Sequence, residues 1–256
     1  MHLFDSLPGL APGLLAAVAV VFLLAGLAKG VVGMGLPTIS MALLALFMAP
    51  AQAAALLVVP SLVTNLWQAR PLSTLMPLLR RIGPMQLGVC AGTLAGAAVF
   101  GAPAGAWGAV ALGAALLAYA AWGLFGTPRA LPPRSEAWLG PCVGLLTGAI
   151  TALTGVFVVP AVPYLQSLAL DKDALIQAMG VSFTVSTVAL AAGLWLNGSY
   201  GAGAAGASFA MLGPALLGMA AGQRLRRTLS PRMFRLCFMA SLAALGAYQV
   251  IEGLGF

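Results

Sequence analysis

The chain has 256 residues, of which 61% are hydrophobic and only 7% are charged, and its mean hydropathy is +1.03. A soluble domain of this length cannot bury so much apolar surface, so the composition indicates an integral membrane protein. The net charge of +7 does not point to nucleic acid as a partner, because the basic residues are spread over the loops between apolar segments.

Apolar segments follow one another along almost the whole chain and predict an all-α, polytopic membrane protein. In chain order they occupy residues 13–29, 36–48, 50–67, 84–100, 105–125, 137–153, 157–169, 173–196, 203–223 and 233–253. No basic stretch precedes the first segment, so we do not expect a cleaved signal peptide. The segment from Arg70 to Arg81 is basic at both ends and apolar between them, which predicts a short separate helix in the membrane interface.

Two of the apolar stretches are interrupted by glycine. The first break reads GVVGMGLP over residues 30–37, and the second reads GAITALTG over residues 148–155, with Pro160 just beyond it. Glycine and proline weaken a helix, and backbone groups freed inside a membrane must be buried in protein or line a cavity. A pair of interrupted segments in corresponding halves of a chain points to the binding site of a transporter.

The basic residues predict the topology. Apart from Lys29, all of the twelve lie between segments or at their ends: Arg70, Arg80, Arg81, Arg129, Arg134, Lys172, Arg224, Arg226, Arg227, Arg232 and Arg235. If basic loops face the cytoplasm, residues 13–48 and residues 137–169 must each leave and return to the same side. Their half-segments of about 12–17 residues span roughly 18–25 Å, less than a ~30 Å hydrocarbon core. Charge alone does not separate a re-entrant hairpin from two short crossings.

We therefore expect two inverted-topology repeats, each with a broken or re-entrant hairpin followed by three transmembrane helices. The first transmembrane repeat covers residues 1–126, a cytoplasmic linker covers residues 127–136, and the second repeat covers residues 137–256. Together they form one integrated membrane domain. Both termini are expected on the extracytoplasmic side.

The residues around the breaks resemble a known family. AKGVVGMG at residues 28–35 followed by PAQAAAL at residues 50–56 resembles the first-repeat signature of the TauE/SafE sulfite-exporter family. GLLTG at residues 144–148, Pro160 and LDKDA at residues 170–174 look similar to the second repeat. The resemblance implies a secondary transporter in the inner, cytoplasmic membrane of a bacterium. It also implies a small sulfur-containing anion as substrate, such as sulfite or the organosulfonate sulfoacetate, with export as the direction.

Small and hydroxylated residues at the two breaks are candidates for the substrate site. Gly33 and Gly35 permit a tight backbone with exposed N–H groups, and a half-helix starting near Thr38 would aim its positive end at the same place. Thr151 and Thr154 supply hydroxyls at the matching break. The alternative role of the glycines is close packing of helices.

Lys29, beside the first break, is a further candidate. A lysine inside the membrane costs about 2.5–3.5 kcal/mol on insertion scales and needs a reason. Lys29 either attracts an anion to the break or extends its side chain to the cytoplasmic interface.

A polar stripe runs along one span after each hairpin. The stripes are Ser61, Asn65 and Gln68 in the first half and Gln177, Ser182 and Ser186 in the second. Such residues either contact a substrate or form hydrogen bonds between helices. We assign Asn65 and Gln177 to the site because they are costlier to bury, and we include Ser61 and Ser182 as further site candidates. We assign Gln86, Thr93, Gln166 and Ser208 to packing.

The remaining chemistry is limited. No carboxylate lies clearly inside an apolar segment, and the sequence contains no Ser/His constellation and no cluster of metal ligands. We therefore expect no enzyme activity, no cofactor and no metal; the expected partners are a small anionic substrate and membrane lipid, with a homodimer as a further hypothesis. Two alternatives to a carrier remain open, namely a passive anion channel and a non-transporting membrane assembly subunit.

Overall fold

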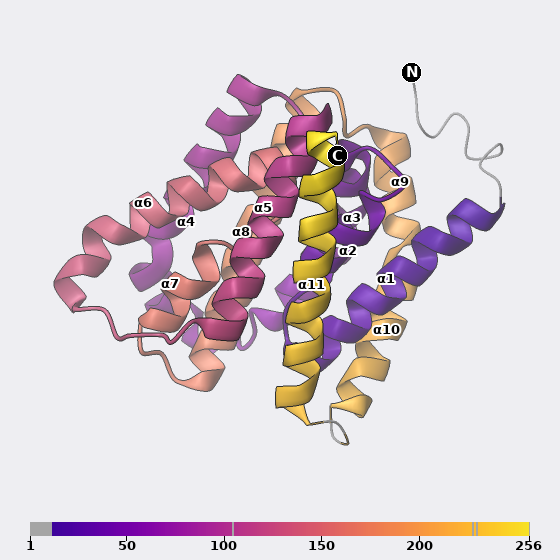
Figure 1. Cartoon of the computed structure of the whole chain (residues 1–256). Helices are drawn as coiled ribbons and strands as arrows, with labels where there is room; N and C mark the ends of the chain where they lie inside the picture. Colours follow the sequence, from indigo (N-terminus) through magenta and orange to yellow (C-terminus); the bar gives the residue numbers. More distant parts are fainter. Residues whose placement is uncertain (1–11, 104, 227, 229, 256) are drawn as a thin grey trace.

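The structure is a computed structural model that describes residues 12–255, apart from residues 104, 227 and 229. Within these residues every regular element is a helix, which confirms the all-α class (Figure 1). Eight stretches of the described chain are helical, long and apolar enough to cross a membrane. A polytopic membrane protein is therefore confirmed.

The two halves of the chain have a similar order of helices. The first half contains α1 (Pro12–Val32), α2 (Leu36–Leu44), α3 (Pro50–Gln68), η2 (Leu72–Thr74), α4 (Leu75–Phe100) and α5 (Gly105–Phe125). The second half contains α6 (Pro133–Thr154), α7 (Ala161–Ser167), α8 (Lys172–Leu196), α9 (Ala202–Ala210), α10 (Leu212–Leu225) and α11 (Pro231–Leu254). Each half begins with a long helix followed by a short one, so α2 corresponds to α7. In the matching order of helices, the single helix α4 of the first half corresponds to the two consecutive helices α9 and α10 of the second half.

The segment between Arg70 and Arg81 differs from the prediction. It forms the short helix η2 and then the first turns of α4, which continues to Phe100 without a separate interfacial helix. Pro84 lies inside α4, but a proline there removes the partner of only one carbonyl, so it does not end the helix.

The helices at the two breaks are also unequal in length, whereas the sequence predicted two short arms. α1 and α6 have 21 and 22 residues, or roughly 32–33 Å, which is enough to cross a hydrocarbon core. α2 and α7 have only 9 and 7 residues. The first arm is longer than expected because Gly30 stays helical and α1 continues to Val32.

The beginning of α1 and the end of α11 lie at the same end of the molecule, at the top of Figure 1. The end of α10 and the beginning of α11 lie at the opposite end. We call this opposite end the basic end, because it carries Arg226 together with Arg81 and Lys172, as the contacts described below show.

Helices from different halves approach each other closely through glycine. On α1, a Cβ atom at Gly30 would lie 2.8 Å from the backbone N of Gln223 and 2.9 Å from Cα of Gly222, both on α10. On α6, a Cβ atom at Gly148 would lie 2.5 Å from the backbone N of Thr93 and 2.8 Å from the carbonyl carbon of Gly92, both on α4. Only glycine permits such contacts between backbones.

These two interfaces repeat the same contacts at equivalent positions. Gly30 on α1 meets α10 as Gly148 on α6 meets α4, and Gly222 corresponds to Gly92. Gly30 therefore serves the packing of helices. The left-handed backbone at the breaks is formed by other glycines, as described below. Two structurally related halves would produce this repetition; their opposite orientation in the membrane stays a prediction.

Candidate functional site

The first break lies where the sequence predicts it. Gly33 has φ of 83° and Gly35 has φ of 111°, a left-handed backbone that favours glycine. The Gly33 N–H donates to the Lys29 carbonyl at 2.7 Å and ends α1, and the Ile39 N–H donates to the Gly35 carbonyl at 2.8 Å in the first turn of α2.

The second break is closed by its own threonines. Gly155, with φ of 69°, follows α6, and its N–H donates to the Thr151 carbonyl at 2.8 Å. The Thr154 hydroxyl donates to the Ile150 carbonyl at 2.7 Å and accepts the Val156 N–H at 3.1 Å. The Thr151 hydroxyl donates to the carbonyl of Thr147 at 2.7 Å. Both hydroxyls thus satisfy backbone groups at the break.

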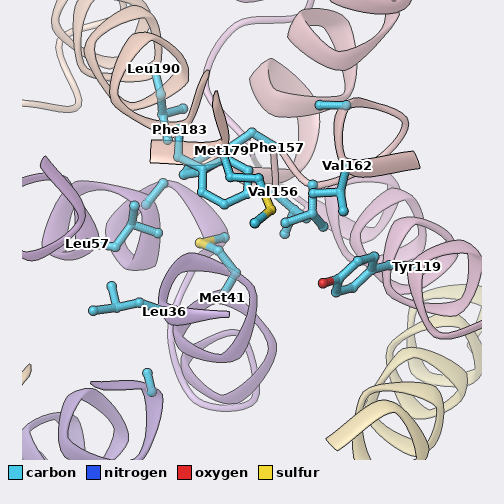
Figure 2. Packing of buried hydrophobic residues seen from close by; sticks show 14 of the residues in the cluster. Leu36, Met41, Leu57, Tyr119, Val156, Phe157, Val162, Met179, Phe183 and Leu190 are labelled. Carbon is cyan, nitrogen blue, oxygen red and sulfur yellow. The ribbon is translucent and has the colours of Figure 1, made fainter. Parts of the chain in front are cut away.

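Apolar side chains fill the space around the second break. A Cβ atom at Gly155 would lie 3.0 Å from Sδ of Met41 on α2. Beyond it, the rings of Phe157 and Phe183 lie 5.4 Å apart, and Figure 2 shows them grouped with Met41 and Met179. We call Met41, Met179, Phe157 and Phe183 the apolar plug. The structure therefore brings the second break against α2 but packs apolar atoms there.

Lys29 is buried and does not extend to the interface. Its side chain in the last turn of α1 is 4% exposed, and its ammonium donates a hydrogen bond to Oδ1 of Asn65 on α3. Nδ2 of Asn65 is buried and has no hydrogen-bond partner among the described residues. A cation and a free amide donor therefore lie side by side in the interior.

A cavity of about 420 Å³ opens from Lys29 toward the basic end, and Asn65 lies behind the lysine rather than in the cavity wall. Its walls include Lys29 and Gly33 from α1 and its break, Lys172 from α8 and Arg226 after α10. No described aspartate or glutamate lines it. The cavity thus carries three basic side chains without a carboxylate, an arrangement that favours a small anion over a cation.

Two further candidates lie in the buried interior near α3. Thr38 on α2 and Ser61 on α3 are fully buried, and neither hydroxyl has a hydrogen-bond partner in the described part of the chain. Ser61 stands one turn before Asn65 on the same helix. By contrast, the neighbouring hydroxyl of Thr64 donates to the Pro60 carbonyl at 2.7 Å.

Gln177 and Ser182 on α8 lie outside this cavity. The Nε2 group of Gln177 donates to the carbonyls of Ala69 and Pro71 at 3.0 and 2.5 Å, and its Oε1 accepts from the Thr74 hydroxyl at 2.9 Å. Gln177 therefore fixes the connection before α4 and lines a separate cavity of about 730 Å³ with Arg70 and Arg81. Ser182 is fully buried without a partner among the described residues.

An ion pair at the basic end joins both halves. Arg81 on α4 donates to Glu136 on α6 through Nε and Nη2 at 2.9 and 2.7 Å, and Nη2 also donates to the Leu168 carbonyl after α7 at 2.7 Å. It is the one ion pair that the described residues form. Sequence reasoning missed it, because the two residues lie far apart in the chain and no motif connects them.

Two of the four residues assigned to packing have that role. Oε1 of Gln166 accepts from the Trp122 indole at 3.0 Å, and the Ser208 hydroxyl donates to the Leu56 carbonyl at 2.8 Å. The polar atoms of Gln86 and Thr93 are instead buried without partners among the described residues. The sequence around a single polar residue in a helix does not show whether its polar atoms will find a hydrogen-bond partner.

One protein family, described as sulfite exporter TauE/SafE, has a sequence profile that matches residues 18–249. The chain belongs to this family. The match covers nearly all of the chain, so the resemblance read from the glycine breaks is confirmed. The TauE/SafE family consists of membrane transporters of sulfur anions rather than enzymes, in agreement with the eight membrane-spanning stretches. No curated protein and no solved structure matches the chain.

Proposed function

We propose that this TauE/SafE protein exports sulfite or a short organosulfonate, and that the anion binds at Lys29 in the cavity at the basic end. The observation that carries the proposal is the Lys29–Asn65 pair. A buried ammonium with only a neutral amide oxygen as partner lacks a counter-charge, and an oxyanion supplies one.

The donors around the cavity suit an oxyanion. Lys29 provides N–H donors beyond the one given to Asn65, because an ammonium has three. The Nδ2 group of Asn65 and the hydroxyls of Ser61 and Thr38 are further buried donors without partners among the described residues, and Ser61 stands one turn from Asn65 on α3. Gly33 contributes backbone to the cavity wall, so the glycine break and the lysine act at one place.

The apolar plug favours a carrier over an open channel. The cavity opens at the basic end, whereas Met41 packs against Gly155 and the two phenylalanine rings fill the interior behind it. A charged oxyanion does not pass such packing unless the helices move. Transport by alternating access requires that motion, and a passive pore does not.

The direction and location of transport follow from the charges. Basic loops face the cytoplasm in inner-membrane proteins, so the basic end with Lys172 and Arg226 lies in the cytoplasm and both termini lie outside. The cavity then opens to the cytoplasm of the bacterium, where an exporter collects its substrate. Gly35, Thr151, Thr154, Gln177 and Ser182 do not line the cavity and remain candidates of a different kind. The hydroxyls of Thr151 and Thr154 and the amide of Gln177 bond to the backbone, whereas the hydroxyl of Ser182 has no partner among the described residues.

The test is export of radiolabelled sulfite from liposomes that contain the purified full-length protein. Wild-type protein should release sulfite faster than empty liposomes, with a saturable rate and with exchange against unlabelled sulfite. Lys29→Met should lower the rate at subsaturating sulfite by roughly 10- to 150-fold, because a hydrogen bond to a charged group contributes about 1.5–3 kcal/mol.

Arg80→Gln is the matched control, since Arg80 is an exposed charge near the basic end that does not line the cavity. It should leave the rate near that of wild type. A wild-type rate equal to that of empty liposomes would favour the assembly-subunit alternative, and flux without saturation would favour the channel. Normal export by Lys29→Met would place the anion elsewhere.

A further inference from the structure

A second group of buried polar side chains lies where α4 from the first half of the chain packs with α6 and α8 from the second half. Its members are at most 7% exposed and have polar atoms without a hydrogen-bond partner among the described residues. They are Gln86, Thr93, Thr147, Ser182 and Ser186. We call them the α4–α6–α8 group.

The usual behaviour of hydroxyls in helices does not explain this group. Thr184 and Thr187 on α8 donate to the carbonyls of the residues four positions earlier, at 2.7 and 2.6 Å. This local bond satisfies a hydroxyl inside a membrane helix. Ser182 and Ser186 on the same helix do not make it. Their oxygen atoms are therefore free to bind something else.

The register of α4 and α8 places the members of the group on facing sides. A Cβ atom at Gly193 would lie 2.9 Å from Cβ of Ala97, so these two residues mark the contact between the helices. Ser186 and Ser182 precede Gly193 by about two and about three turns on α8. They therefore share its face.

On α4, Thr93 and Gln86 precede Ala97 by about one and about three turns and share its face in the same way. Residues near the starts of both helices line one cavity at the basic end, and the helices meet again at Gly193 and Ala97, so they run in the same direction. The hydroxyls of α8 and the amide and hydroxyl of α4 therefore belong to the faces through which these two helices meet.

Thr147 occupies in the second half the position that Lys29 occupies in the first. Each residue directly precedes the glycine that packs against the partner helix, Gly148 on α6 and Gly30 on α1. Thr147 is fully buried, like Lys29, but it is neutral.

The last turns of α1 and α6 differ in charge. The C-terminal end of a helix carries about half a negative charge, and a cation near it is stabilising. α1 has Lys29 in its last turn, whereas α6 has no basic residue there and continues about two turns beyond Thr147 to Thr154. Thr147 therefore matches Lys29 in its place beside the packed glycine, not in its distance from the helix end.

We propose that a small monovalent cation, Na⁺, binds in the α4–α6–α8 group and takes there the role that the Lys29 ammonium has in the first half. Hydroxyl and amide oxygens are ligands for hard cations. A divalent ion needs carboxylates, and no described aspartate or glutamate belongs to the group. Ser186 follows Ser182 by one turn on α8, the same spacing that separates Asn65 from Ser61 on α3.

The inference rests on the proposed function in one respect, since a cation in the same membrane interior favours binding of an anion at Lys29. Anion affinity should then be at least about fivefold higher in sodium than in potassium, the lower limit of usual coupling between two sites. The cation site itself needs no anion.

The experiment measures thermal unfolding of the purified full-length protein in equal concentrations of NaCl, KCl and choline chloride, with and without sulfite. NaCl should raise the unfolding midpoint above the values in the other two salts. Thr147→Val and Ser186→Ala should each remove this difference. Thr184→Val is the matched control on α8, because its hydroxyl is bonded within the helix, and it should keep the difference.

The outcomes separate the two proposals. Equal midpoints in NaCl and KCl, or an undiminished sodium effect in both Thr147→Val and Ser186→Ala, overturn the cation site. A sodium effect without any response to sulfite supports the cation site and overturns the proposed function. Sulfite binding with the same affinity in all three salts, together with equal midpoints in them, overturns the cation site and leaves the proposed function standing.

Discussion

Lys29 on α1 donates a hydrogen bond to Asn65 on α3, and both side chains are buried. The amide orients the ammonium and leaves its own N–H donors for another partner. A carboxylate at position 65 would instead neutralise the lysine within the protein. In the proposed site we therefore expect the neutrality of Asn65 to matter as much to anion binding as the charge of Lys29.

Two substitutions of Asn65 test this relationship. Asn65→Ala leaves the ammonium without its partner and should weaken sulfite binding by about 1–3 kcal/mol. Asn65→Asp should weaken it further, because the aspartate pairs with Lys29 and repels the anion. Equilibrium binding to purified protein gives the comparison, with Gln52→Ala at the other end of α3 as the control. A carboxylate variant that binds as tightly as wild type would contradict the assignment.

The charges at the cavity mouth should act over longer range. Lys172→Gln and Arg226→Gln should each reduce sulfite affinity by about 0.2–1 kcal/mol, since both side chains are exposed and screened. The loss should disappear near 1 M salt, where the screening length is about 3 Å. A loss that persists in high salt would mean direct contact with the anion.

Substitutions of Arg81 and of Glu136, which form one ion pair, should lower the stability of the fold by different amounts. Arg81→Gln removes the bonds to both Glu136 and the Leu168 carbonyl, whereas Glu136→Gln removes only the charge of the acceptor. Because Arg81 is more than one third exposed, we expect a modest loss of about 0.5–1 kcal/mol for Arg81→Gln and less for Glu136→Gln. Thermal unfolding measures both, and the reverse order would argue against the Leu168 contact.

Glycines on α4 should differ sharply in their tolerance of alanine. A Cβ atom at Gly92 would overlap Leu145 on α6, whereas one at Gly83 meets nothing within 4 Å. Gly92→Ala should reduce the yield of folded protein, because the helices must separate. Gly83→Ala should be neutral or stabilise by up to about 1 kcal/mol, since alanine favours helix. Similar yields for both variants would contradict the packing described here.

Reporter fusions test the orientation. A reporter that works only outside the cytoplasm should be active when it is fused at Phe256. A reporter that works only in the cytoplasm should be active when it is inserted between Thr127 and Glu136. A cytoplasmic C-terminus would overturn the inverted topology and, with it, the direction in which the Lys29 cavity opens.

Local chemistry made the breaks predictable from sequence. Gly33, Gly35 and Gly155 stand in glycine runs next to apolar helices, and a left-handed backbone is found at each of them. The family signature and the all-α class follow from the same patterns. The separate helix expected between Arg70 and Arg81 failed because a proline inside a membrane helix breaks one hydrogen bond, not the helix.

Contacts between distant helices set the limit of prediction. Gln177 has the size and polarity of a site residue, but its partners Ala69 and Pro71 come from another helix end. The role of Thr147 is visible only when the packing of Gly148 is compared with that of Gly30. Neither relationship produces a residue spacing that can be recognised in a single sequence.

The glycine interfaces also determine which helices can move together. α1 is bound backbone to backbone to α10, and α6 is bound in the same way to α4, so each tightly joined pair takes one helix from each half of the chain. A conformational cycle that kept these contacts would carry α1 with α10 and α6 with α4 as rigid bodies. The mechanical units of the molecule would then be different from its sequence repeats, and Lys29 and Thr147 would travel on opposite bodies.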